Sequence, residues 1–162
     1  MAVNAIRVPV VNDNQIFEYS DTLSLPIGNQ QAHLEPGDVV IINADNGIAG
    51  ILQTKVRPTT PEPEKTLGEV LTAPTYGLNG PGYASVRVAG GVFELVGKVA
   101  NGGAKVGDPV YAKAPISGTA KPEITTSNVN AEVIIGWLKE PLSASPDIQK
   151  MQVVLAPAKT TR

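Results

Sequence analysis

The chain has 162 residues, 42% of them apolar, and its 13 basic and 15 acidic residues give a formal net charge of −2. This length suits one domain, which can bury roughly two-thirds of its unfolded surface without a disulfide or a metal. The absence of cysteine excludes a disulfide framework and a thiolate metal site. The charges are scattered and form no basic run, so no nucleic-acid partner is expected.

Sixteen glycines and fourteen prolines stand beside only seven aromatic residues. Aliphatic side chains must therefore fill the core, and many short strands joined by turns fit this composition. We predict a mainly β protein with little helix. The N-terminus lacks the basic start and unbroken apolar core of a signal peptide, so we expect synthesis in the cytoplasm without an export signal. No apolar run approaches the ~18 residues that cross a bilayer, so no membrane partner is expected.

Residues 1–19 are predicted to form an N-terminal arm with the first strands, ahead of a single β domain over residues 20–162. The arm begins with AIRVPVV, in which apolar side chains recur with the period of a strand. Pro9 has no N–H to donate, so this strand should lie at an edge or stand apart. An unpaired strand suits addition to a neighbouring chain. The expected contact residues are Ile6, Arg7, Val8, Pro9 and Val10.

The firmest local prediction is a β-hairpin. The apolar runs EPGDVVII and IAGILQTKV flank the turn cluster NADNG, which is typical of two antiparallel strands. The segment TLSLPIG precedes this hairpin and contains Pro26, which predicts a second edge strand.

The middle of the chain is rich in turn residues. Residues 58–66 carry three prolines and predict an exposed loop. The run LGEVL that follows fits one helical turn or a strand. Three further runs, listed here in chain order, are predicted strands: DPVYAKA, AEVIIGWLKE and DIQKMQVVLAP.

Two glycines interrupt the run VRVAGGVFELVG. We predict that Gly90 and Gly91 form a bulge or a point of close approach, which lets one strand bend while the residues after them return to the core. A kink without any contact role is an equally good interpretation.

Two parts of the chain share a short sequence pattern, although the similarity is weak. Gly37 and Asp38 precede one apolar run, and Gly107 and Asp108 precede another. Glycine accepts positive φ and aspartate bonds nearby N–H groups, so these four residues are predicted to form structural turns. The segments IAGIL and IIGWL share a second pattern. We favour the independent use of common turn residues over a true duplication.

The sequence offers little catalytic chemistry. His33 is the only histidine and lies in a polar segment, so a solvated role is favoured over a catalytic one. Asp45 lacks the spacing of a calcium loop. Asp38 and Asp108 could serve glycoside cleavage only if they met, and turn capping explains both. The glycine-rich loops lack phosphate-binding spacing. We expect no enzyme activity, no cofactor and no metal.

The order of several short motifs resembles the capsid decoration, or cement, proteins of tailed bacteriophages, a family long described only as a domain of unknown function. The resemblance spans roughly residues 3–140 and departs from the family pattern at 58–66 and after 140. The matching residues are Gly37, Asp38, Val40, Ala49, Gly50, Gly91, Val92, Phe93, Leu95, Gly107, Asp108, Val110, Tyr111, Ile135 and Gly136.

This resemblance implies a compact β-barrel or β-sandwich that forms homotrimers on the outer surface of the expanded capsid. The implied partner is the major capsid protein, and the implied location is the virion. A decoration protein needs no catalytic group, because binding only the mature shell stabilises that shell by mass action.

Three other functions stay open. A carbohydrate- or host-binding module on the virion would use the same scaffold and would need exposed aromatic residues, for which Tyr76 and Tyr83 are the nearest pair. A lipoyl-type domain would need a modifiable lysine at a hairpin tip, and none stands out. A β-fold hydrolase is the third.

Overall fold

The computed structural model describes residues 22–60, 76, 79–115, 118 and 120–160. Within these residues the chain forms strands and two 3-10 helices but no α-helix, which confirms the prediction of a mainly β protein. The elements are β1 (Thr22–Pro26), η1 (Asn29–Gln31), β2 (Val39–Asn43), η2 (Ala44–Asn46), β3 (Ile48–Leu52), β4 (Tyr83–Arg87), β5 (Val92–Lys98), β6 (Pro109–Lys113), β7 (Glu123–Thr125), β8 (Val133–Leu138) and β9 (Ile148–Lys159).

Some predictions fall outside the described residues. They are the arm with its five expected contact residues, most of the proline-rich segment and the run LGEVL. The boundary between residues 19 and 20 lies there as well.

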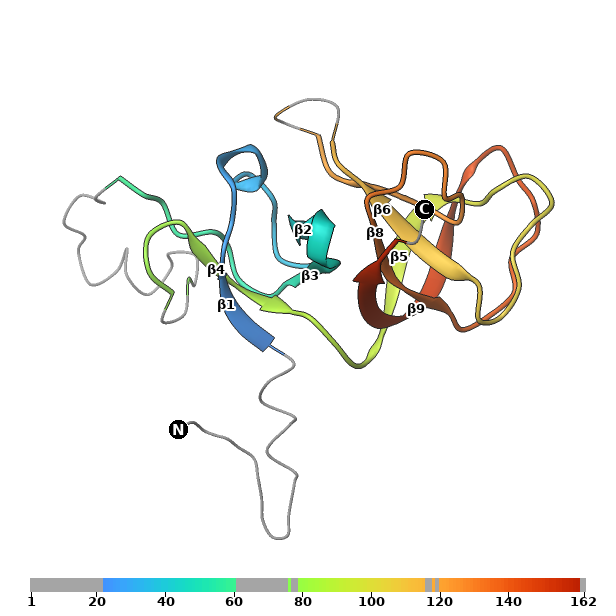
Figure 1. Cartoon of the computed structure of the whole chain (residues 1–162), viewed down its shortest axis with the longest axis horizontal. Helices are drawn as coiled ribbons and strands as arrows, with labels where there is room; N and C mark the ends of the chain where they lie inside the picture. Colours follow the sequence, from blue (N-terminus) through green and yellow to red (C-terminus); the bar gives the residue numbers. More distant parts are fainter. Residues whose placement is uncertain (1–21, 61–75, 77–78, 116–117, 119, 161–162) are drawn as a thin grey trace, which may run out of the picture.

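The strands form two sheets that lie side by side (Figure 1). The first has four strands in the order β1-β4-β3-β2, and the second closes into a barrel in the order β5-β7-β6-β8-β9. All pairs are antiparallel except β5 with β7. Of the expected β-barrel or β-sandwich, the barrel is present, with a second sheet beside it.

The predicted hairpin is β2 and β3, joined through η2. The side chain of Asn43 accepts a hydrogen bond from the N–H of Asn46 (3.0 Å), and Gly47 ends the turn with φ of 71°. β1 is the edge of the first sheet, as its proline suggested. Ile27, just after Pro26, donates its N–H to Gly82. Because residues alternate along an antiparallel edge, Pro26 occupies a position whose N–H would point away from β4.

Gly90 and Gly91 join the two sheets, so the prediction of one bent strand is wrong. Arg87 ends β4 in the first sheet, and Val92 begins β5 in the barrel. Gly90 donates its N–H to the carbonyl of Leu155 (3.0 Å), and Leu155 donates its N–H to the carbonyl of Gly91 (3.1 Å). Two residues thus face one, as in a bulge. Their φ values of 74° and 83° explain the glycines.

Two apolar cores follow from these sheets. The larger fills the barrel and also contains Val39, Ala49 and Ile51 from the β2–β3 hairpin. The smaller lies on the other side of that hairpin, where Val40 and Leu52 pack with residues of β4 and the flanking loops. Alternate residues of β2 therefore face different cores, as the period of a strand requires.

The two Gly-Asp turns have the same hydrogen bonds. Gly37 donates to Leu52 (2.8 Å), and Leu52 donates to the carbonyl of Asp38 (2.9 Å). Gly107 likewise donates to Leu138 (2.9 Å), which donates to the carbonyl of Asp108 (2.9 Å). Each aspartate carboxylate also accepts the backbone N–H three residues before it, at 2.9 Å and 2.7 Å.

The match extends to whole sheets. Val40 pairs with Gly50 in the first, as Val110 pairs with Gly136 in the second. The order β1-β4-β3-β2 has the counterpart β5-β9-β8-β6 around the barrel. In both, the strand after the Gly-Asp turn pairs with the strand that carries the apolar-Gly-apolar run. The interpretation of the shared patterns as common turn residues alone is therefore wrong, and the chain contains a structural repeat.

The repeated glycines have one packing reason. A Cβ at Gly50 would lie 2.2 Å from the carbonyl oxygen of Arg87 on β4. A Cβ at Gly136 would lie 2.2 Å from the carbonyl oxygen of Val154 on β9. Neither distance leaves room for a side chain, so each strand needs glycine where the next backbone approaches closely.

The two halves of the repeat differ at the outer edge of the strand that follows the Gly-Asp turn. In the barrel, β7 lies between β5 and β6, and Tyr111 of β6 pairs with Thr125. The matching residue of β2 is Ile41, whose N–H and carbonyl bond the side-chain amide of Gln31 at 3.0 and 2.7 Å. One glutamine thus takes the place of a strand and blocks the free edge of β2.

Candidate interaction surfaces

An apolar row crosses the outside of the barrel. Four residues on neighbouring strands stand opposite one another in register, so their side chains share one face. In strand order they are Pro109 on β6, Trp137 on β8, Val154 on β9 and Val92 on β5. The last three are 38%, 39% and 48% exposed. Exposed apolar side chains gathered in one place mark an interaction site more often than scattered ones do.

Trp137 is the centre of this row and the only tryptophan in the chain. Its neighbour Leu138 is buried at 2% exposed and anchors β8 in the core. Tryptophan is enriched among the residues that dominate binding energy at protein interfaces. The row therefore has the composition of a contact surface.

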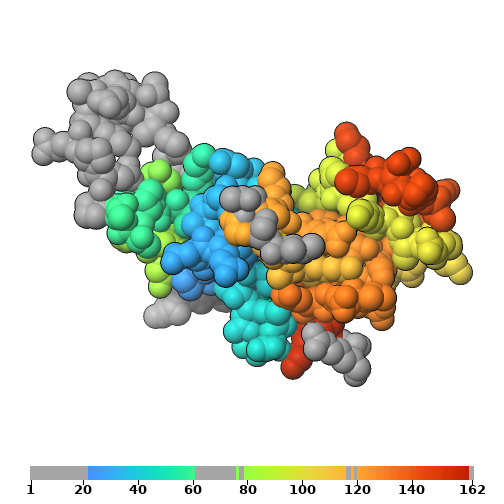
Figure 2. All heavy atoms as spheres, turned by 90° about the horizontal axis from the view of Figure 1, so that it is seen from above, coloured from blue at the N-terminus to red at the C-terminus, as the bar shows by residue number. Residues whose placement is uncertain are grey.

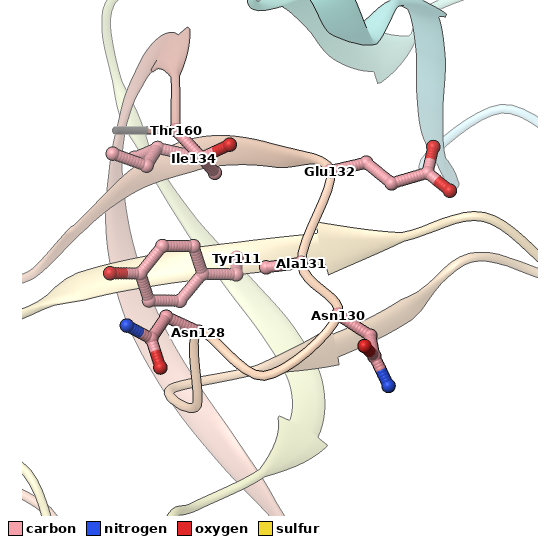
Figure 3. A pocket seen from close by; sticks show the side chains of 7 residues that line it. All are labelled: Tyr111, Asn128, Asn130, Ala131, Glu132, Ile134 and Thr160. Carbon is pink, nitrogen blue, oxygen red and sulfur yellow. The ribbon is translucent and has the colours of Figure 1, made fainter. Parts of the chain in front are cut away.

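A hollow of about 550 Å³ lies beside the row, on the outside of β6 and β8. Figure 3 shows the ring of Tyr111 above the amide of Asn128, with Ile134 and Thr160 on the opposite wall. Glu132 and Asn130 point away from that ring, toward the far side of the loop. The lining combines one aromatic ring with neutral polar groups and the carboxylate of Glu132.

The loop that lines the hollow is held by its own hydrogen bonds. Thr125 accepts the N–H of Ser127 (3.1 Å), and the Ser127 hydroxyl accepts the N–H of Val129 (3.3 Å). Asn130 has φ of 57°, the one positive value outside glycine among the described residues. Neither Asn128 nor Asn130 has a side-chain partner within the described part of the chain. A fixed loop thus presents unpaired amides at a concave surface.

The predicted structural residues lie in the turns described above and come together in no common site. Asp38 also pairs with Lys121 at 2.7 Å, which ties the β6–β7 loop to the first sheet. His33 is exposed, and its Nε2 lies 3.2 Å from the carbonyl oxygen of Ala120. Asp38 and Asp108 each cap their own turn, as their sequence context suggested.

The aromatic pair considered for carbohydrate binding does not line this hollow. Tyr76 stacks with the guanidinium of Arg57, whose carbon lies 5.9 Å from the ring centroid. Tyr83 is 40% exposed at the start of β4. Tyr111 is the aromatic residue that lines this hollow instead.

Asn79 is a buried polar residue that sequence reasoning missed. Its side chain bonds Thr54 (3.2 Å), Ser85 (3.1 Å) and Ser24. These contacts tie the loop before β4 to β1 and β4, so its role is structural. The described residues contain no group of three or more metal-ligating side chains. The short helices of this part of the chain are not long and apolar enough to span a membrane.

The residues of the apolar row and the hollow were also missed as site residues. DPVYAKA and AEVIIGWLKE were predicted strands, but the face of each strand that meets solvent depends on its partners. Comparison with protein-family models, with curated proteins and with solved structures finds no match for this chain.

Proposed function

We propose that the protein is a decoration protein of a tailed-bacteriophage capsid, bound as a homotrimer to the outside of the expanded shell. Its partners are the major capsid protein and further copies of itself, and it contacts neither nucleic acid nor membrane. The observation that carries the proposal is the order of the matching motifs along the chain. A protein of this kind acts by contact and has no catalytic site.

The apolar row supports self-association more than capsid contact. A decoration protein is made free and reaches the shell later. The surface that will contact the shell is therefore exposed to water before binding and should be polar enough to remain so. Permanent interfaces between subunits are more apolar than transient ones. The row with Trp137 at its centre fits a permanent contact between copies.

Co-sedimentation tests the proposal. Shells of the major capsid protein encoded in the same genome would be prepared before and after expansion and mixed with the purified protein. We expect saturable binding to expanded shells and at least about tenfold weaker binding to unexpanded ones, because the site forms only on expansion. Equal binding to both forms, or none to expanded shells, would contradict the proposal.

The hollow favours a second candidate, a saccharide-binding module on the virion. Tyr111 offers a ring on which the apolar face of a sugar could stack, and Asn128 beside it offers an amide for the sugar's hydroxyl groups (Figure 3). The loop geometry keeps these groups in place, which lowers the entropy cost of binding.

An array of neutral oligosaccharides tests this candidate. The function predicts a bound glycan whose affinity falls at least about tenfold in Tyr111→Ala. The matched control is Tyr83→Ala, which removes a more exposed tyrosine elsewhere and should bind normally. Absence of glycan binding, or equal losses in both variants, would exclude the hollow as a saccharide site.

A further inference from the structure

The outer face of the β2–β3 hairpin is covered by the barrel of the same chain. Val39 and Ile51 are 6% and 1% exposed, and both belong to the apolar cluster of the barrel. β3 lies against β8 and β9. Figure 2 shows the hairpin, in cyan, beside the orange strands of the barrel. In the first half of the repeat, this face is thus packed against a second half.

The same face of the second half is open. The shared turns and pairings make Pro109 the counterpart of Val39, and Trp137 the counterpart of Ile51. Where Ile51 is 1% exposed, Trp137 is 38% exposed. Tyr111 lies on this open face too, as the counterpart of Ile41. One half of the repeat therefore has its outer face occupied, while the other presents it to solvent.

We propose that the open outer face of β6 and β8 binds the first sheet of a second copy, head to tail. The contact between copies would then repeat the contact that joins the two halves of one chain. The inference rests on the proposed homotrimer and names its interface. When copies join head to tail in a line, the outer face of β6 and β8 stays exposed on the copy at one end. Closing three copies into a ring covers this face on all three.

The intrachain contact also indicates the receiving side. The start of β2 shares a hollow of about 360 Å³ with residues 94–96 of β5 and with Pro122 and Ile124 around β7. The counterpart of β5 in the first sheet is β1, which pairs only with β4 among the described residues. β8 and β9, against which β3 packs, have β3 and β4 as their counterparts. The receiving side of the next copy is therefore the part of its first sheet that β1, β4 and β3 form.

Charge substitutions on the open face test the inference. Trp137→Glu and Pro109→Glu each place an acid in the proposed interface. The control is Ile148→Glu, because Ile148 is 62% exposed on the same barrel but lies six residues from Val154 along β9. That separation is roughly 20 Å. Each variant would be examined by light scattering coupled to size exclusion, with circular dichroism to establish folding.

We expect the wild type and Ile148→Glu to have three times the 16.9 kDa mass of one chain. The two interface variants should keep the β spectrum while their dissociation constants rise at least about 30-fold. If Trp137→Glu fails to fold, Pro109→Glu decides. A folded interface variant that stays trimeric overturns the inference and leaves the trimer standing. A wild-type monomer or a dimer overturns the head-to-tail ring, while co-sedimentation tests capsid binding separately.

Discussion

Replacing Gly136 by alanine is expected to destabilise the fold by about 3 kcal/mol or more. The added Cβ would lie 2.2 Å from the carbonyl oxygen of Val154, and a backbone atom cannot move aside as a flexible side chain can. Gly136→Ala must therefore separate β8 from β9, which line the larger core. Chemical denaturation monitored by circular dichroism measures the loss.

Two further variants complete this experiment. Gly50→Ala should show a loss of similar size, because its Cβ would meet the carbonyl oxygen of Arg87 at the same 2.2 Å. Gly80→Ala is the matched control, since nothing lies within 4 Å of its Cβ, and it should change stability by no more than about 0.5 kcal/mol. A mild effect of Gly136→Ala would show that β8 and β9 are not packed as described.

Deleting residues 2–11 is expected to abolish capsid binding while the protein stays folded. The deleted segment contains the alternating residues Ile6, Val8 and Val10, which predict an apolar strand, and such a strand can add to a neighbouring subunit or to the capsid. The described sheets and both apolar cores are built from residue 22 onward. Co-sedimentation with expanded shells and thermal unfolding measure the two properties separately.

Replacing Ile6, Val8 and Val10 together by serine is the matched control for length. It keeps the segment but removes its apolar side, so it should lose binding as the deletion does. If the truncated protein is destabilised or insoluble, the segment belongs to the fold rather than to a contact. Full capsid binding by a well-folded truncation would refute the contact role of the arm.

The sequence predicts local structure where turn residues and period-two runs coincide. The hairpin of β2 and β3 and the edge strand β1 were found in this way, because glycine, asparagine and proline act on their immediate neighbours. The aspartates of the two turns were also assigned correctly to capping. Each of these assignments depends on contacts within a few residues.

The two shared patterns suggested a repeat, but it was not favoured because the two halves have different loops. Gly37 and Gly107 are 70 positions apart, but Gly50 and Gly136 are 86 apart, since the segment containing β7 separates β6 from β8. No fixed period therefore runs through the chain. The equivalence lies in backbone hydrogen bonds and register, which sequence letters do not display.

The exposed row was missed for a related reason. The run VIIGWL around Trp137 is continuously apolar, which is typical of a buried strand. The register of β8 shifts between Ile134 and Gly136, so neighbouring residues change face and Trp137 turns outward. Exposure in a barrel follows from such shifts, and the pattern alone does not locate them.

Cryo-electron microscopy of expanded shells tests the central claim most directly. Shells of the major capsid protein from the same genome would be reconstructed with and without added protein. We predict added density on the outer surface, in three-fold clusters that each accommodate three copies of two β halves. Shells that show no added density at saturating protein concentration, or density on the inner surface alone, would contradict the claim.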